Sequence, residues 1–206
     1  MVDDDHARTP EETLRLIEQQ RTATVRRLHG DPVLLYVPWG VAWLLGFTAL
    51  FLHYGLDGVP YAPISRPLAL TVLFAGMSLA GAIAVFGMVK MGAQVRGETS
   101  AKGMMYGYAW VAGMISMTVL AVRLSPQLSA TESGLLWGGG FMMLVALLYM
   151  AGGAIWTYWP MFFVGVWTAV VNGVGVMLGA GWHALLTAVL TGGGYIVTGI
   201  VLRRRT

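Results

Sequence analysis

Six long apolar stretches occupy most of the chain between Leu34 and Leu202, and short polar segments separate them. None of them carries Asp, Glu, Lys or Arg in its middle. An α-helix rises 1.5 Å per residue, so about 20 apolar residues cover a hydrocarbon core of about 30 Å. We therefore predict an all-α, polytopic integral membrane protein. Its transmembrane helices are expected near residues 33–55, 67–89, 104–123, 134–156, 161–180 and 184–202.

The composition agrees with a surface that faces lipid. Charged residues make up 11% of the 206 residues, whereas soluble domains carry about 25%. Cysteine is absent, which excludes disulfides and cysteine-ligated metals or clusters. The chain also lacks the residue spacings of nucleotide-binding loops, zinc-protease helices and EF-hands. We expect no cofactor, no metal and no nucleic-acid partner; the lipid bilayer is the expected surrounding.

Residues 1–32 form a separate polar segment that contains a predicted amphipathic helix. Thr9 is a candidate N-cap, Pro10 occupies the first helical position, and Glu12 completes a capping box. One face then follows at spacings of three and four, with Leu14, Ile17, Arg21, Val25 and Leu28. Two arrangements remain open for this helix. It lies in the membrane interface, or it packs on the protein's own cytoplasmic loops.

The basic residues predict the orientation, because cytoplasmic loops are enriched in Lys and Arg. With the N-terminus inside, eleven of the 13 basic residues lie on the inner side. Only Arg66 and Arg123 then lie outside. We therefore expect both termini to be cytoplasmic, a six-helix domain at 33–202, and a basic tail at 203–206. The expected location is the plasma membrane.

Small and polar residues at mid-depth suggest a substrate pocket. Glycine-interrupted spans often mark the binding site of transporters, and a carboxamide within the bilayer is expected to face the bundle interior. The predicted pocket consists of Ser78, Ser116, Asn172, Thr191, Gly192, Gly193 and Gly194. An alternative remains open, in which the glycines only allow close helix packing and Asn172 joins two helices.

The titratable residues near the outer ends of the spans form a second candidate set. An outer vestibule is predicted from His53, Asp57, Arg66, Arg123, Glu132 and His183. The alternative is that they are solvated loop charges and interfacial histidines. No ionisable residue is expected at mid-depth, which argues against a proton pump or a voltage sensor. Ser78 and Ser116 have no base at similar depth, so we do not expect an enzyme.

Three functions are compatible with these features. The first is a small transporter or channel-like protein that moves a small solute through a central, non-ionisable polar pocket. The second is a permease subunit driven by a separate ATPase. The N-terminal helix and the basic loop at 90–102 resemble the layout of ABC-2-type permeases, which implies an ATPase bound at these two segments. The third is a non-transporting structural or regulatory subunit of a membrane complex. Small-residue helix faces also make a homo-oligomer plausible.

Overall fold

The computed structural model describes residues 11–12, 14–15, 31–56, 58–92 and 98–205. Six helices in these ranges are long and apolar enough to cross a membrane, which confirms the predicted number of spans. They are α2 (Pro32–Tyr54), α3 (Arg66–Gly92), α4 (Glu98–Leu124), α5 (Ala130–Ile155), α6 (Trp159–Leu178), and a last helix built from three parts. Those parts are α7 (Ala180–Leu186), the π-helix η2 (Thr187–Gly192) and α8 (Gly193–Arg205).

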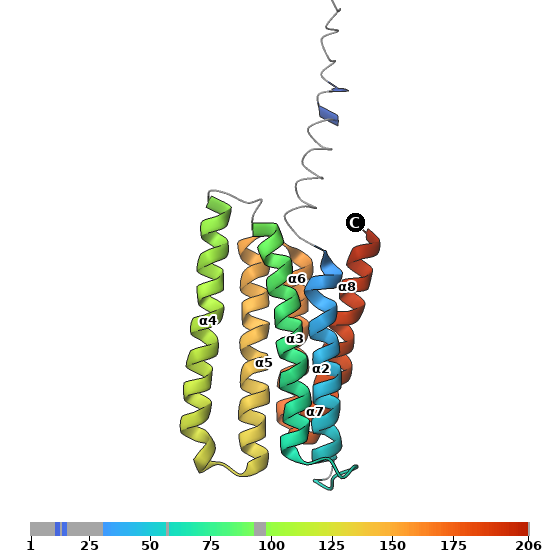
Figure 1. Ribbon diagram of the computed structural model, residues 1–206, viewed down its shortest axis with the longest axis vertical. Helices are drawn as coiled ribbons and strands as arrows, with labels where there is room; N and C mark the ends of the chain where they lie inside the picture. The colour runs from blue at the N-terminus through green and yellow to red at the C-terminus, as the bar shows by residue number, and fades with distance from the viewer. Residues whose placement is uncertain (1–10, 13, 16–30, 57, 93–97, 206) are drawn as a thin grey trace, which may run out of the picture.

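The predicted amphipathic helix falls almost wholly outside the described residues. Only Glu11, Glu12, Leu14 and Arg15 of that segment are described, and they are helical. The loop at 90–102 is likewise described only at its two ends. The start of α2 and the end of α8 lie at the same end of the bundle (Figure 1). This arrangement is the one that an even number of spans requires.

Local sequence signals set the helix ends. Asp31 caps α2, because its carboxylate accepts a hydrogen bond from the Val33 amide at 2.9 Å. Ser129 and Glu132 form a capping box at the start of α5. A one-residue link at Gly179, with φ of +102°, ends α6 and lets α7 begin immediately. Glycine suits this link because other residues rarely adopt such a φ.

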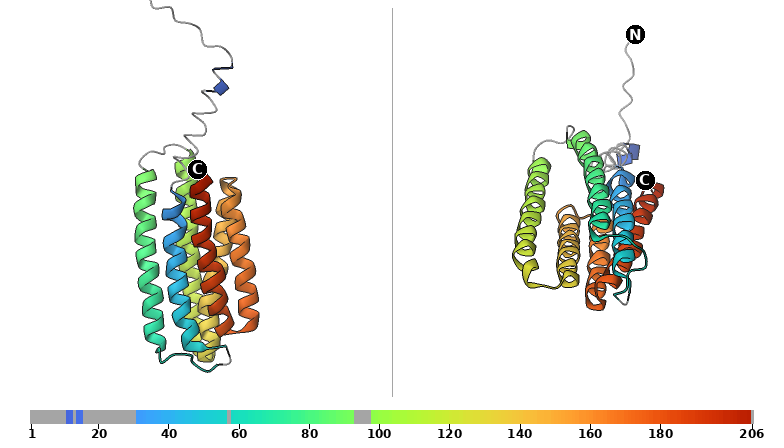
Figure 2. Two further views of the ribbon diagram at one scale, coloured as in Figure 1. Left: turned by 90° about the vertical axis from the view of Figure 1, so that its right-hand side faces the viewer. Right: turned by 60° about the horizontal axis from the view of Figure 1, so that its bottom comes forward.

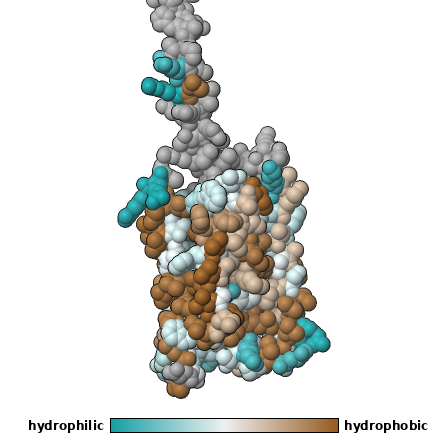
Figure 3. Space-filling model, turned by 180° about the vertical axis from the view of Figure 1, so that it is seen from behind, coloured by the Kyte–Doolittle hydropathy of each residue, from teal (hydrophilic) through white to brown (hydrophobic). Residues whose placement is uncertain are grey.

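The core lies between α2, α3, α5, α6 and the last helix, and α4 lies at the side of the bundle next to α5 (Figures 1 and 2). α2 packs against α3 and along the whole last helix, while α5 packs mainly against α6. α4 packs against α5 and the short 3-10 turn Ser125–Gln127, and most of its described side chains are exposed. The flank seen from behind is mainly hydrophobic, with hydrophilic groups towards its two ends (Figure 3). Such a band fits lipid contact.

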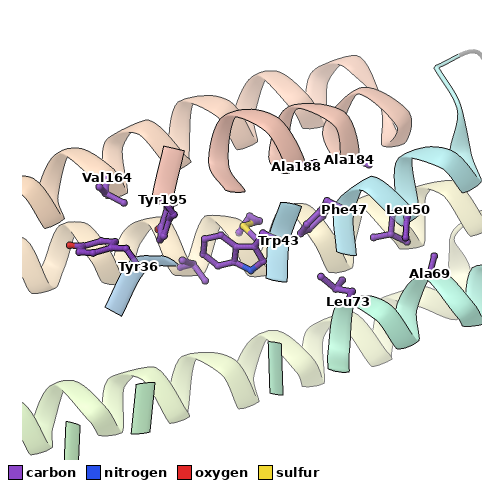
Figure 4. Close-up of a cluster of buried hydrophobic side chains, with 13 residues drawn as sticks. Tyr36, Trp43, Phe47, Leu50, Ala69, Leu73, Val164, Ala184, Ala188 and Tyr195 are labelled. Carbon is purple, nitrogen blue, oxygen red and sulfur yellow. The ribbon is translucent and has the colours of Figure 1, made fainter. Parts of the chain in front are cut away.

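Aromatic side chains fill the core between α2 and α8. Trp43 lies edge-on against Tyr195 with ring centroids 4.6 Å apart, and Tyr195 also contacts Tyr36 at 5.8 Å. These rings line up along the bundle axis with Phe47 and Leu50 (Figure 4). The helices approach closely at Gly40, where an added Cβ would lie 2.7 Å from the carbonyl oxygen of Gly192. α2 and the last helix are therefore in backbone contact.

Candidate functional site

A buried hydrogen-bond network links α5, α6 and α7 close to the Gly179 link between α6 and α7. The His183 Nε2 atom on α7 lies 2.9 Å from the Oδ1 atom of Asn172 on α6. The Asn172 Nδ2 atom donates to the carbonyl of Gly139 on α5, also at 2.9 Å. His183 is 3% exposed and Asn172 is 7% exposed.

The network determines which nitrogen of His183 carries the proton. The Gly139 carbonyl can only accept, so the NH₂ group of Asn172 must face it. The amide oxygen of Asn172 then faces His183, and it also can only accept. His183 must therefore donate through Nε2–H. In the neutral ring this leaves Nδ1 as an acceptor.

Glycines on two helices make the space that the imidazole occupies. A Cβ at Gly175 on α6 would lie 2.9 Å from the Cα atom of His183, and a Cβ at Gly138 on α5 would lie 3.0 Å from its Cε1 atom. Phe47 on α2 closes the third side, with its ring edge-on to the imidazole at 5.8 Å. The ring is thus held between α2, α5 and α6, and any side chain at the two glycines would displace it.

Further polar side chains continue from this network towards the end of the bundle at which α2 starts and α8 ends (Figure 1). The last helix buries a polar residue at every fourth position, and α6 buries two that are four residues apart. Residues at this spacing share a helix face. Thr168 Oγ1 donates to the Val164 carbonyl at 2.8 Å and lies 3.4 Å from the Tyr195 hydroxyl. We call the set the polar row: His183, Asn172, Thr187, Thr168, Thr191 and Tyr195.

Two donors on fully buried side chains have no hydrogen-bond partner in the part of the chain that the structure describes. They are Thr187 Oγ1 and Trp43 Nε1, on side chains that are 1% and 2% exposed. Buried polar groups in proteins are nearly always satisfied, by protein or by water. These two positions are therefore candidates for contact with a water molecule or a ligand.

The last helix departs from α-helical geometry where the polar row crosses it. Residues Thr187–Gly192 form a π-helix, and such segments are rare and frequent at functional sites. Trp167 on α6 donates from Nε1 to the carbonyl of Leu190 at 2.9 Å. The indole thus provides a hydrogen-bond partner for a carbonyl of the π-helix. In lipid, where no water is present, backbone polar groups need such partners within the protein.

The structure brings together only part of the predicted pocket. Asn172, Thr191 and Gly192 are buried in the bundle, while Gly193 and Gly194 are partly buried. Gly192 is in backbone contact with α2, where an added Cβ would lie 2.7 Å from the Leu44 nitrogen. Ser78 on α3 and Ser116 on α4 lie on exposed faces. These two serines therefore do not meet Asn172.

The predicted vestibule residues are mostly separate from one another. Arg123 and Glu132 are exposed, and Glu132 is engaged in the capping box of α5. His53 Nδ1 lies 2.9 Å from the Ile64 carbonyl. Arg66 is partly buried, and its Nε has no hydrogen-bond partner among the described residues. Asp57 lies outside the described residues.

His183 lies inside the last helix and is buried, so its predicted place in an outer vestibule, before a sixth span that starts at residue 184, is wrong. The last helix starts at Ala180 because Gly179 makes the link a single residue long. His183 therefore falls within the helix, on its buried face. The sequence does contain an indication of this position. His183 lies four residues before Thr187, and the same spacing continues to Thr191 and Tyr195.

No group of three His, Asp or Glu side chains that could hold a metal ion occurs among the described residues. Comparisons with protein-family models, curated proteins and solved structures found no match to this chain.

Proposed function

We propose that this multi-pass membrane protein is a small transporter or channel-like protein for a small, uncharged polar solute. The observation that carries the proposal is the polar row, which runs along the buried faces of α6 and the last helix. Polar side chains inside a bilayer are costly and are often found on substrate pathways. The row offers hydroxyl, amide and imidazole groups but no carboxylate or ammonium, which favours an uncharged solute over an ion.

The polar row differs from the pocket expected from the sequence in its chemistry as well as in its members. That pocket was non-ionisable, whereas the polar row contains His183. Its Nε2 is held by Asn172, so the imidazole serves the row as a hydrogen-bonding group with a defined orientation. We propose that Asn172 is a positioning residue, and that His183 and the threonines contact the solute.

Passage of a solute requires movement of the helices. Trp43, Phe47 and Tyr195 occupy the centre of the bundle (Figure 4), so we propose that this arrangement is a closed form. The π-helix at Thr187–Gly192 is the proposed point of movement, because π-helical turns are interruptions of regular α-helical packing. Its bond to Trp167 would hold the closed form.

The test is solute uptake by liposomes that contain the purified full-length protein. Stopped-flow light scattering would follow swelling after mixing with urea or glycerol. Uptake of at least one probe above the rate of protein-free liposomes is expected. His183→Gln is expected to lower this rate, and Ser116→Ala, on an exposed face of α4, serves as the matched control. Rates equal to those of protein-free liposomes for both probes would overturn this substrate class.

A second candidate is a non-transporting subunit of a membrane complex, and the exposure of α4 favours it. Gly103 and Gly107 on α4 have open space where a Cβ would be, and their spacing is that of the GxxxG helix-packing motif. A partner helix or a second copy would fit such a surface. Purification from the native membrane in mild detergent, followed by mass spectrometry, tests this function. A stoichiometric membrane partner supports it, a stoichiometric ATPase supports the permease alternative, and the protein alone contradicts both.

A further inference from the structure

The Thr187 hydroxyl is a buried donor without a hydrogen-bond partner among the residues that the structure describes. Thr71, Thr118 and Thr168 each donate to the carbonyl four residues earlier, at 2.9, 2.8 and 2.8 Å. The equivalent acceptor for Thr187 is the carbonyl of His183, and no such bond forms. Thr187 is nonetheless 1% exposed. Its hydroxyl is therefore a buried donor that does not use its own helix.

An acceptor lies one helical turn away. His183 precedes Thr187 by four residues, so the two side chains are neighbours on one face of the helix. The Asn172 bond makes Nε2 the protonated nitrogen of His183, which leaves Nδ1 as an acceptor in the neutral ring. The Nδ1 side of the ring lies against Gly138 of α5, where a Cβ would be 3.4 Å from Nδ1. Gly138 has no side chain that could bond to it.

We propose that His183 and Thr187 together bind one hydroxyl group, which donates to His183 Nδ1 and accepts from the Thr187 hydroxyl. The hydroxyl belongs either to a bound water molecule or to a small alcohol or polyol. In the second case the inference rests on the proposed transport function and names its substrate class. Both sources supply one donor and one acceptor on a single oxygen, which is the complement of this pair.

The surroundings favour a neutral ligand. Phe47 covers the imidazole from α2, glycines face it from α5 and α6, and both polar atoms of the Asn172 amide are already bonded. A charged ligand would be left without a counter-charge in this apolar enclosure, which is costly. A hydroxyl is small enough to be matched by the two side chains alone.

The first experiment observes His183 directly in the full-length protein in liposomes, labelled with ¹⁵N-histidine. Solid-state NMR would record the Nδ1 signal, assigned by its loss in His183→Gln. In the native protein we expect Nδ1 to have the ¹⁵N chemical shift of a nitrogen that accepts a hydrogen bond. Thr187→Val is expected to move this chemical shift to the value of a nitrogen without a hydrogen bond, and Thr187→Ser is expected to restore the native value. Thr118→Val is the matched control, because Thr118 is exposed and bonded to its own helix. An Nδ1 signal that is the same in native protein and Thr187→Val overturns the proposal.

A glycerol titration of the same samples separates the two sources. A saturable change of the Nδ1 signal that Thr187→Val abolishes identifies a polyol hydroxyl, and glycerol uptake is then expected to fall about tenfold in that variant, as for loss of one hydrogen bond. A bonded Nδ1 that glycerol does not alter identifies water and rejects the polyol. The site stands if the NMR result holds while no solute is taken up, so failure of the transport function is distinguishable from failure of the site.

Discussion

His183 donates a hydrogen bond from Nε2 to the Asn172 amide oxygen over 2.9 Å, although eleven residues of chain separate them. The Asn172 amide nitrogen in turn donates to the Gly139 carbonyl. One carboxamide therefore ties α5, α6 and the last helix together. It also sets the tautomer of the imidazole, which makes it a positioning residue for the polar row.

Asn172→Leu is expected to destabilise the protein by about 1–2 kcal/mol. The substitution leaves the His183 imidazole without its buried partner and removes the bond to the Gly139 carbonyl. The free energy of unfolding in mixed micelles, titrated with SDS, measures the effect. Ser78→Ala, on an exposed face of α3, should leave the free energy unchanged. Equal stability of Asn172→Leu and the native protein would contradict the role assigned to this network.

Gly40→Ala is expected to lower stability by about 1–3 kcal/mol, the range for overpacking. Its new Cβ would lie 2.7 Å from the Gly192 oxygen and 2.9 Å from the Ile196 nitrogen. Since both atoms are backbone, α2 and the last helix would have to separate. The same SDS titration applies. Gly173→Ala is the control, because an added Cβ at Gly173 has no neighbouring atom within 4 Å outside its own helix backbone. An equally large loss of stability in Gly173→Ala would show that the effect of Gly40→Ala is not due to the contact between helices.

Trp167→Phe is expected to loosen the π-helix. Phenylalanine keeps an aromatic ring but cannot donate to the Leu190 carbonyl, which Trp167 does at 2.9 Å. Loss of one such bond costs about 1 kcal/mol, so amide exchange within 187–192 should become faster. Hydrogen–deuterium exchange with mass spectrometry measures this. Trp159→Phe provides a comparison at an exposed position, and unaltered exchange in Trp167→Phe would mean that the indole does not stabilise the irregular segment.

Single-cysteine labelling tests the predicted orientation, and the chain suits it because it has no native cysteine. Ala62→Cys and Leu128→Cys lie in connections at the end of the bundle opposite the start of α2 (Figure 1). An impermeant maleimide added to intact cells should label both. Thr99→Cys, near the start of α4, should react only after permeabilisation. Labelling of position 99 in intact cells would contradict the predicted orientation.

The mid-depth polar residues show where prediction from the sequence succeeded and where it failed. Asn172 faces the interior, as the cost of a carboxamide in lipid leads one to expect. Ser78 and Ser116 have similar depth in their spans but lie on exposed faces. A serine is inexpensive enough to face lipid when the packing of its helix requires it, so depth alone did not assign these two residues to the interior.

The sequence by itself determined the number of spans and their approximate limits, because an apolar run of bilayer length needs no partner to be recognised. Only the tertiary structure decided which face of each helix is buried. These helices are apolar on all sides, so they lack the polar stripe that marks the exposed face of a soluble helix. The pairing of His183 with Asn172 depended on the one-residue turn at Gly179 and on the small residues of α5 and α6 that admit the ring, and both are properties of the packed bundle.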